Sequence, residues 1–446
     1  MSLLHLSVVG HTNTGKTSLL RTLLRDETFG EVADESATTR HVEEAVIVDE
    51  NGAPLLAIDD TPGLEDALGV LQWLEEHTDR RADGVERIRQ FLDSQAAAEA
   101  YAQEAKVLRQ MLVCDCALYV IDLREPVLDK YRDELTILSW CARPVMPVLN
   151  FVHQGDTAAW QTMLSRRNLH VISSFDTVAF DFDSEITLWQ NLATMLPQRA
   201  DLDTLITLRQ NRWQAMERNA RFAIADFLLN IAAFRREIDE DTHPEPILDE
   251  MKQAVEAAEG ELHRNLLHEY RFYRNQVSAT PLNLRIFHQS IFDPEVWKAY
   301  GIKSSSGAAA GVLFGLGIDA AVGGATLGAG ALIGGAIGGL MPHLRQIRNA
   351  ITGMETLYID PAALTLLAAR ALALLDLLRQ RGHASLDELS PESQRLPWQL
   401  PRLPSELRQA RSHADWSALN GENPADAAEQ RRAAAYRLAE DLKKNS

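Results

Sequence analysis

The stretch that decides the expected fold is Gly10-His11-Thr12-Asn13-Thr14-Gly15-Lys16-Thr17, near the start of this 446-residue chain. It fits the phosphate-loop pattern G-x-x-x-x-G-K-[S/T] at every position. Residues 4–9 before it are typical of a strand, and residues 18–24 after it are typical of a helix. Glycines let successive backbone N–H groups turn towards phosphate oxygens, and the helix N-terminus adds partial positive charge. The complete motif in this context disfavours the alternative, a Gly- and Thr-rich surface turn.

The same motif assigns the residues that contact phosphate. In such loops the lysine lies on the β- and γ-phosphates, and the hydroxyl of the next residue ligates Mg²⁺. Lys16 is therefore a candidate catalytic residue and Thr17 a candidate metal ligand. The predicted nucleotide-binding residues of this region are Gly10, His11, Thr12, Asn13, Thr14, Gly15, Lys16, Thr17 and Ser18.

A second polar motif, Asp60-Thr61-Pro62-Gly63, follows an apolar strand predicted at residues 55–58. The turn Asn51-Gly52 joins this strand to another, predicted at 45–48, as a hairpin. A carboxylate at the end of such a strand can orient a water on Mg²⁺, and the glycine N–H three residues later can reach the γ-phosphate. The D-x-x-G pattern is common by itself, but its place after a phosphate loop and a strand makes it specific.

The motif order GHTNTGKT, TTRH, DTPG resembles the Era/TrmE-like P-loop GTPases of the translation-factor class. The resemblance implies that GTP or GDP binds with Mg²⁺. It also implies that Thr39 is a Mg²⁺ ligand in a switch loop, that Asp60 holds Mg²⁺ through water, and that Gly63 senses the γ-phosphate. Thr39 and Gly63 thereby join Lys16 as expected catalytic residues. The rest of the chain resembles a carboxy-terminal helical domain of unknown function from a bacterial GTPase family.

Leu64 departs from the Ras-like pattern, in which a glutamine after the glycine positions the attacking water. A leucine side chain cannot hydrogen-bond to water. Hydrolysis would then need a residue elsewhere, a bound cation or a partner, and the expected consequence is slow intrinsic turnover.

The base-recognition motif differs even more from the pattern of this GTPase class. Asn150-Phe151-Val152-His153 stands where N-K-x-D is expected, after a strand predicted at 145–149. Asn150 is expected to bind the nucleotide, but a neutral histidine lacks the paired acceptors that a carboxylate offers to guanine N1–H and N2–H. Either Asp156 or another loop carboxylate replaces it, or base selectivity is weakened. Phe151 could still stack on the base, and the resemblance keeps guanine as the expected base.

These patterns predict an α/β fold for residues 1–197. We expect a Ras-like P-loop NTPase domain with a mostly parallel sheet and an antiparallel hairpin of its second and third strands. Residues 66–112 are predicted to be a helical switch-two insertion. The expected helices are residues 67–77, 84–92, 96–112, 127–140, 157–168 and 185–196, and the remaining strands are residues 117–122 and a strand around 177–182.

Residues 198–446 are predicted to form an all-α domain, with its main helices at 207–234, 246–273, 361–380 and 425–444. Residues 307–342 are almost entirely Gly, Ala and aliphatic, with small residues at four-residue spacing, which favours close helix packing. Residues 320–340 are long enough to cross a bilayer. A helical hairpin buried in protein, a reversibly inserting hairpin and a stable span all remain open.

The net charge of −19 argues against a general nucleic-acid binder. No signal peptide is recognised, so the expected location is cytoplasmic, with association of 307–342 with the inner-membrane surface or a membrane protein. The expected function is a Mg²⁺-dependent GTPase that acts as a conformational switch coupled to the helical domain. The alternatives are a membrane-inserting or scaffold protein that binds nucleotide but scarcely hydrolyses it, and an ATPase on the same fold.

Overall fold

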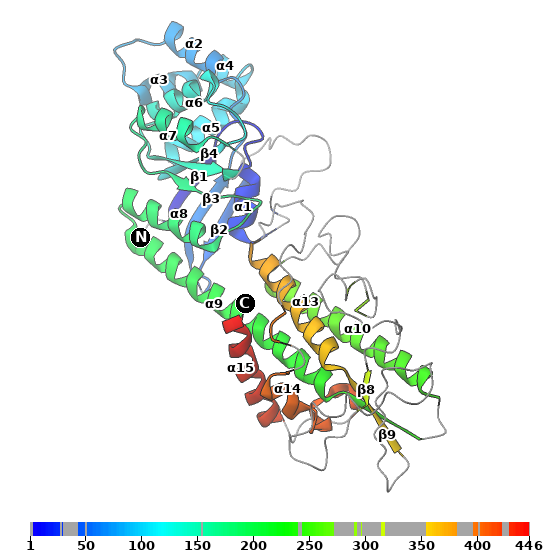
Figure 1. The fold of residues 1–446 in the computed structure, drawn as a ribbon. Helices are drawn as coiled ribbons and strands as arrows, with labels where there is room; N and C mark the ends of the chain where they lie inside the picture. The colour runs from blue at the N-terminus through cyan, green and yellow to red at the C-terminus, as the bar shows by residue number, and fades with distance from the viewer. Residues whose placement is uncertain are drawn as a thin grey trace. The chain divides into compact units, whose positions relative to one another are not determined.

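The computed structural model describes residues 3–26, 29, 43–49, 51–152, 155–239, 243–271, 290–291, 296, 314–316, 354–380, 396–399, 402–421 and 428–445. They divide into two compact units, the first built mainly from Met1–Gln214 and the second mainly from later residues. The chain passes from one unit to the other inside helix α9 (Arg199–Ala233). Figure 1 shows the elements of each unit in chain order.

The first unit contains a six-stranded sheet in the order β2-β3-β1-β4-β5-β6. Each neighbouring pair is parallel except β2 and β3, which are antiparallel. This confirms the predicted mostly parallel sheet with one hairpin. The strands are β1 (Leu4–Val9), β2 (Glu43–Val48), β3 (Pro54–Asp60), β4 (Cys116–Asp122), β5 (Val145–Asn150) and β6 (Ser173–Ser174).

Strands β4 and β5 are buried along their whole length, as their continuous apolar sequences require in a parallel sheet covered by helices. In Figure 1 this sheet lies among the helices of the first unit. These helices are α1 (Lys16–Leu24), α2 (Ala67–His77), α3 (Gly84–Leu92), α4 (Gln95–Ala98), α5 (Ala102–Val113), α6 (Asp129–Trp140), α7 (Thr157–Ser165) and α8 (Phe182–Met195), followed by the first part of α9.

The helical insertion after Gly63 is present, and side-chain caps set its boundaries. Asp66 accepts from the Gly69 N–H at the start of α2, and Asp83 accepts from the Glu86 N–H at the start of α3. The helix predicted at 96–112 is divided into α4 and α5. Ser94 caps the first of these, and the chain turns before the second begins.

The prediction of a strand around residues 177–182 was wrong. The sixth strand is the short β6, four residues earlier, and α8 already begins at Phe182. The backbone N–H groups of Thr177, Val178 and Ala179 donate to the side chains of Asn150 and Asp176. Because side chains bind these groups, they are not available to a strand ladder.

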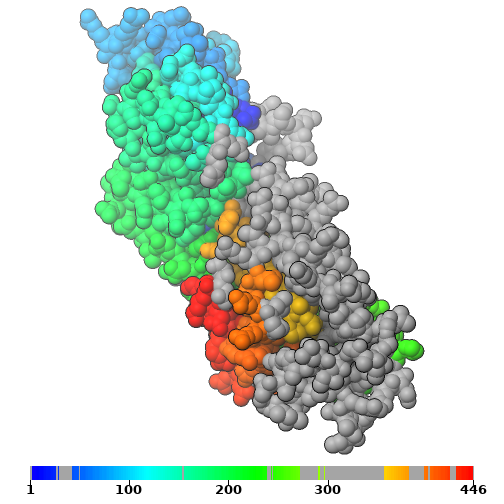
Figure 2. All heavy atoms as spheres, viewed as in Figure 1, coloured from blue at the N-terminus to red at the C-terminus, as the bar shows by residue number. Residues whose placement is uncertain are grey.

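The described part of the second unit is mostly helical, but it is not the all-α domain that was predicted, because it also contains a small sheet. Helix α10 is Pro244–Glu269, α13 is Pro361–Gln380, α14 is Ser405–Ala410 and α15 is Ala428–Asn445, with short 3₁₀ turns at Ala414–Trp416 and Ala418–Asn420. Figure 2 shows α15 beside the segment that contains α14, where Arg437 Nε lies 3.4 Å from Glu406 Oε1.

A three-stranded antiparallel sheet in this unit was not predicted. Its order is β7-β9-β8, formed by β7 (Arg235–Asp239), β9 (Met354–Ile359) and β8 (Phe314–Leu316). Strand β8 belongs to the glycine-rich segment that was expected to be a helical hairpin. The other residues of 307–342 lie outside the described residues.

Helix α13 is the one described helix that is long and apolar enough to cross a membrane. Most of it is buried inside the protein, which is also typical of a core helix. Its Arg370 side chain is fully buried, and the Arg370 Nε lies 2.8 Å from Glu259 Oε1 on α10. Burial raises the pKa of Glu259 to about 7, although Arg370 acts in the opposite direction.

Candidate functional site

The loop between β1 and α1 has the backbone conformation that its glycines predict. Gly10 and Gly15 have φ values of +144° and +94°. A Cβ on Gly10 would lie 2.6 Å from the Val120 carbonyl oxygen, and one on Gly15 would lie 2.4 Å from Asn150 Nδ2. Both glycines are therefore required by close packing as well as by φ.

Lys16 is buried at the start of α1. Its Nζ donates to the carbonyl oxygens of His11 at 2.7 Å and Gly10 at 3.3 Å. Burial lowers the pKa of Lys16 to about 8, while the carboxylates of Asp60, Glu134 and Glu65 oppose that shift. The ammonium thus lies within the loop, where a bound phosphate would be.

Thr17 and Asp60 face each other across the base of this loop. The Thr17 hydroxyl donates to Asp60 Oδ2 at 2.6 Å, and Asp60 is fully buried. Asp60 Oδ1 has no hydrogen-bond partner among the described residues. Burial raises the pKa of Asp60 to about 6, whereas Thr17 and Lys16 act to lower it. A hydroxyl and a carboxylate oxygen are ligands that suit Mg²⁺, so these residues fit the expected ion.

Gly63 lies directly against the loop. A Cβ on it would be 2.2 Å from Thr12 Oγ1, and the Leu64 N–H donates to the Gly10 carbonyl oxygen at 3.1 Å. The next two residues, Glu65 and Asp66, donate their N–H groups to Glu104 Oε1 on α5 at 3.2 and 3.0 Å. The chain after Asp60 is therefore attached both to the loop and to the helical insertion.

A buried carboxylate that the sequence analysis did not select lies behind the loop. Glu134 on α6 is fully buried, and its Oε1 is 2.8 Å from His11 Nδ1. The Tyr119 hydroxyl on β4 donates to Glu134 Oε2 at 2.6 Å. His11 is thereby linked to α6 and, through Glu134, to β4.

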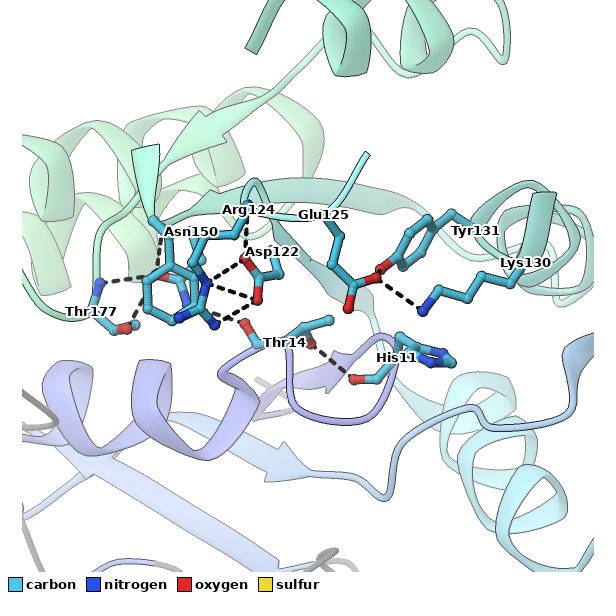
Figure 3. Close-up of polar contacts among 10 residues, drawn as sticks. His11, Thr14, Asp122, Arg124, Glu125, Lys130, Tyr131, Asn150 and Thr177 are labelled. Atoms are coloured by element: carbon cyan, nitrogen blue, oxygen red, sulfur yellow. Dashed lines mark hydrogen bonds and ion pairs between the residues drawn. The ribbon is translucent and has the colours of Figure 1, made fainter. Parts of the chain in front are cut away.

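Asn150 connects the phosphate-binding loop to the loop after β6, as Figure 3 shows. Its Nδ2 donates to the Thr14 carbonyl oxygen at 3.1 Å. Its Oδ1 accepts from the Thr177 N–H and hydroxyl at 3.0 and 3.1 Å. The side chain is fully buried, so the structure gives Asn150 a role in holding the two loops together.

Phe151 and Arg124 lie beside Asn150. The Arg124 guanidinium carbon is 3.7 Å from the centre of the Phe151 ring. Asp122 binds this guanidinium through both oxygens, with Nη2 2.7 Å from Oδ2 and Nε 2.9 Å from Oδ1 (Figure 3). A planar cation therefore covers one face of an aromatic ring next to the phosphate-binding loop.

The structure brings most of the predicted site together. The residues of the loop, Asp60, Gly63 and Asn150 gather at the carboxyl ends of β1, β3 and β5. Thr39, a predicted Mg²⁺ ligand, lies outside the described residues, and so does His153, which stands where the base-reading carboxylate of the motif was expected.

The sequence analysis missed Glu134, Arg124 and Thr177. The contacts that bring them to the site, with His11, Phe151 and Asn150 respectively, are made with residues far away in sequence, and no short motif marks them. The one available signal was Asp122, a carboxylate at the end of an apolar strand with an arginine two residues later.

The sequence matches two known family models. Residues 161–440, more than half of the chain, match the family described as "Domain of unknown function (DUF3482)". The chain belongs to this family. Residues 5–151 match a second family model, described as "50S ribosome-binding GTPase". This DUF3482 protein is thus a P-loop GTPase followed by a helical domain of unknown function.

Solved structures resemble only part of this DUF3482 protein. Era from Aquifex aeolicus, bound to GDP·AlF4⁻, is 18% identical, with a TM-score of 0.32 over 44% of this chain and 58% of that chain. The bacterial selenocysteine-specific elongation factor EF-Sec is 14% identical, with a TM-score of 0.26 over 40% of this chain and 26% of that chain. The G domain of the T. maritima FeoB iron transporter is 16% identical, with a TM-score of 0.23; the match covers 39% of this chain and 88% of that chain. Among curated proteins, none matches this chain.

Proposed function

We propose that this DUF3482 protein binds GTP and GDP with Mg²⁺, and that slow GTP hydrolysis acts as a conformational switch. The observation that carries the proposal is the Thr17–Asp60 pair. The two oxygens lie 2.6 Å apart at the base of a closed glycine loop, and the second Asp60 oxygen has no partner among the described residues. A buried carboxylate left partly unpaired in this way is suited to a cation ligand or to the water that the cation holds.

We assign the following roles in nucleotide binding and hydrolysis to residues of the chain. Lys16 and the loop amides would bind the β- and γ-phosphates and stabilise charge that develops on the transferred phosphoryl group. Thr17 and Thr39 would hold Mg²⁺ directly and Asp60 through water, and the bound ion would neutralise charge on the phosphate oxygens. The Gly63 N–H would hydrogen-bond to the γ-phosphate.

Slow turnover follows from Leu64, whose side chain is 1% exposed. A buried leucine neither accepts from nor donates to a water, so the residue after Gly63 cannot orient the nucleophile. Another group, a bound cation or a partner would have to do so.

The switch would act through Gly63. Loss of the γ-phosphate would release the Gly63 N–H, and the adjacent N–H groups of Glu65 and Asp66 are bound to Glu104 on α5. Movement at Gly63 would thereby be transmitted to helices α2 to α5. On this proposal, the helical domain at 198–446 responds to the GTPase domain at 1–197.

The proposed location is the cytoplasm. The partner proposed for residues 307–342 is an inner-membrane surface or a membrane protein, and this part rests on the sequence pattern alone. No nucleic-acid partner is proposed, because the net charge of −19 opposes binding to phosphate backbones.

Steady-state hydrolysis by the full chain tests the proposal, with GTP or ATP and with or without anionic liposomes. GTP turnover that Lys16→Ala abolishes, and that the exposed control Lys444→Ala leaves unchanged, supports the switch. Bound nucleotide that stays intact for hours under every condition supports the scaffold alternative. Equal turnover of ATP supports the ATPase alternative.

A further inference from the structure

Phe151 has a backbone conformation that aromatic residues rarely adopt. Its φ is +56°, in the left-handed region. Asn150 stabilises this conformation, because its Oδ1 accepts from the Phe151 N–H at 2.9 Å. Residues held in sparsely populated conformations are concentrated at ligand sites, where the surrounding structure fixes them.

The Phe151 ring lies next to the phosphate-binding loop. A Cβ built on Gly15 would be 3.8 Å from Phe151 Cε2, which is van der Waals distance. Arg124 covers one face of the ring, and Asp122 fixes the guanidinium by bidentate hydrogen bonds. The other face is the one on which a planar group attached to a bound triphosphate could stack.

Three described carboxylates of this region, those of Asp122, Asp156 and Asp176, are already bound to groups of the protein. Asp122 binds Arg124, and Asp156 accepts from the Ala158 and Ala159 N–H groups as the cap of α7. Asp176 accepts from three backbone N–H groups, those of Val152, Val178 and Ala179. None of these carboxylates is therefore set aside for the N1–H and N2–H edge of guanine.

From these contacts we infer that Phe151 is the base-binding platform of this site. A purine ring stacks on the face of Phe151 opposite Arg124, while Arg124, fixed by Asp122, packs against the other face. The site thus binds the purine by its π face and does not read the 2-amino group of guanine. This inference deepens the proposed function and rests on the loop binding a triphosphate.

Calorimetric titration of the full chain with Mg²⁺ tests the inference, using GTP, ITP and inorganic tripolyphosphate as separate ligands. ITP lacks only the 2-amino group of GTP, and tripolyphosphate lacks a base altogether. In the unsubstituted chain, GTP and ITP are expected to bind within about threefold of each other, because an unread amino group contributes little. Phe151→Leu should weaken the binding of GTP and of ITP by about tenfold, which is the usual contribution of base–aromatic stacking to affinity. Tripolyphosphate affinity should be unchanged.

Three matched variants sharpen the result. Phe151→Tyr keeps the ring and should keep the affinity for GTP. Arg124→Met keeps an apolar stem without the guanidinium, and should weaken GTP but not tripolyphosphate. Arg132→Met removes an exposed arginine that pairs with Asp129, and should change nothing.

Two results would overturn the inference. One is an equal effect of Phe151→Leu on GTP and tripolyphosphate, or no effect on either. The other is a preference for GTP over ITP of about a hundredfold or more, because a polar group would then read the base edge. Failure of the proposed function looks different: the unsubstituted chain would bind tripolyphosphate no better than Lys16→Ala does.

Discussion

His11 Nδ1 and Glu134 Oε1 lie 2.8 Å apart, so a fully buried carboxylate on α6 is bound to the phosphate-binding loop. His11 also provides the carbonyl oxygen that accepts from Lys16 Nζ. The position of Lys16, the proposed catalytic lysine, is therefore linked through His11 to helix α6.

Glu134→Ala should weaken nucleotide binding by about tenfold, because it removes the hydrogen-bond partner of the partly buried His11 ring and of the buried Tyr119 hydroxyl, at a cost of ~1–3 kcal/mol. Tyr119→Phe is the matched control, since it removes the other hydrogen bond to the same carboxylate and leaves His11 bound. Calorimetric titration with GDP measures both. Equal losses in the two variants would mean that the His11 contact has no particular role.

Asp60→Asn should raise the Mg²⁺ concentration needed for tight GTP binding by about 10- to 100-fold, the usual effect of losing a group that holds a metal through water. Binding of GDP in EDTA should stay within a few-fold of the unsubstituted chain. Nucleotide affinity measured across a Mg²⁺ series checks this. A parallel loss of affinity in EDTA would instead assign Asp60 to the stability of the loop.

Gly63→Ala should slow GTP hydrolysis by ~10-fold or more, as the loss of one preorganised N–H donor does elsewhere. The new Cβ would lie 2.2 Å from Thr12 Oγ1 and 2.8 Å from the Thr12 backbone, so the segment has to move away from the loop. Single-turnover hydrolysis measures the rate, and GDP affinity should change little. Gly260→Ala, on helix α10 with only the flexible end of Arg264 nearby, should leave the rate unchanged.

The second unit should lose stability as the pH rises from about 4.5 towards 7. Burial raises the pKa of Glu259 from 4.5 to about 7, so the folded state binds a proton that the unfolded state releases across this range. Glu259→Gln should match the unsubstituted chain at pH 5 and exceed its stability at pH 8.

Urea unfolding at the two pH values, followed by pulse-labelling hydrogen exchange of α13 peptides, measures this effect. The exposed Glu261→Gln on the same helix should follow the unsubstituted chain. A Glu259→Gln chain less stable than the unsubstituted chain at pH 8 would show that the ion pair with Arg370 outweighs the cost of burying the carboxylate.

Short sequence motifs predicted those parts of the first unit whose conformation is set by neighbouring residues. The phosphate-binding loop is set by its glycines, and helices α2 and α3 have the predicted boundaries because Asp66 and Asp83 cap them. Strand β6 was misplaced because Asn150, more than twenty residues away in sequence, binds the backbone of Thr177. Such a contact leaves no periodic pattern in the sequence.

The candidate site likewise contains residues that the sequence predicted and residues that it did not. Lys16, Thr17 and Asp60 belong to contiguous motifs, so their meeting could be expected. The pairs His11–Glu134 and Phe151–Arg124 form only when separate strands and helices come together. Nothing in the spacing of these residues indicates either pair.

The pairing of β8 with β9 has a topological consequence. Phe314 lies opposite Ile359 and Leu316 lies opposite Leu357, so the chain leaves this small sheet after Leu316 and re-enters it on the neighbouring strand. Because the two strands are antiparallel neighbours, β8 ends and β9 begins at the same end of this sheet. Leu316 and Met354, although 38 positions apart in the sequence, are therefore held on the same side of the second unit's sheet.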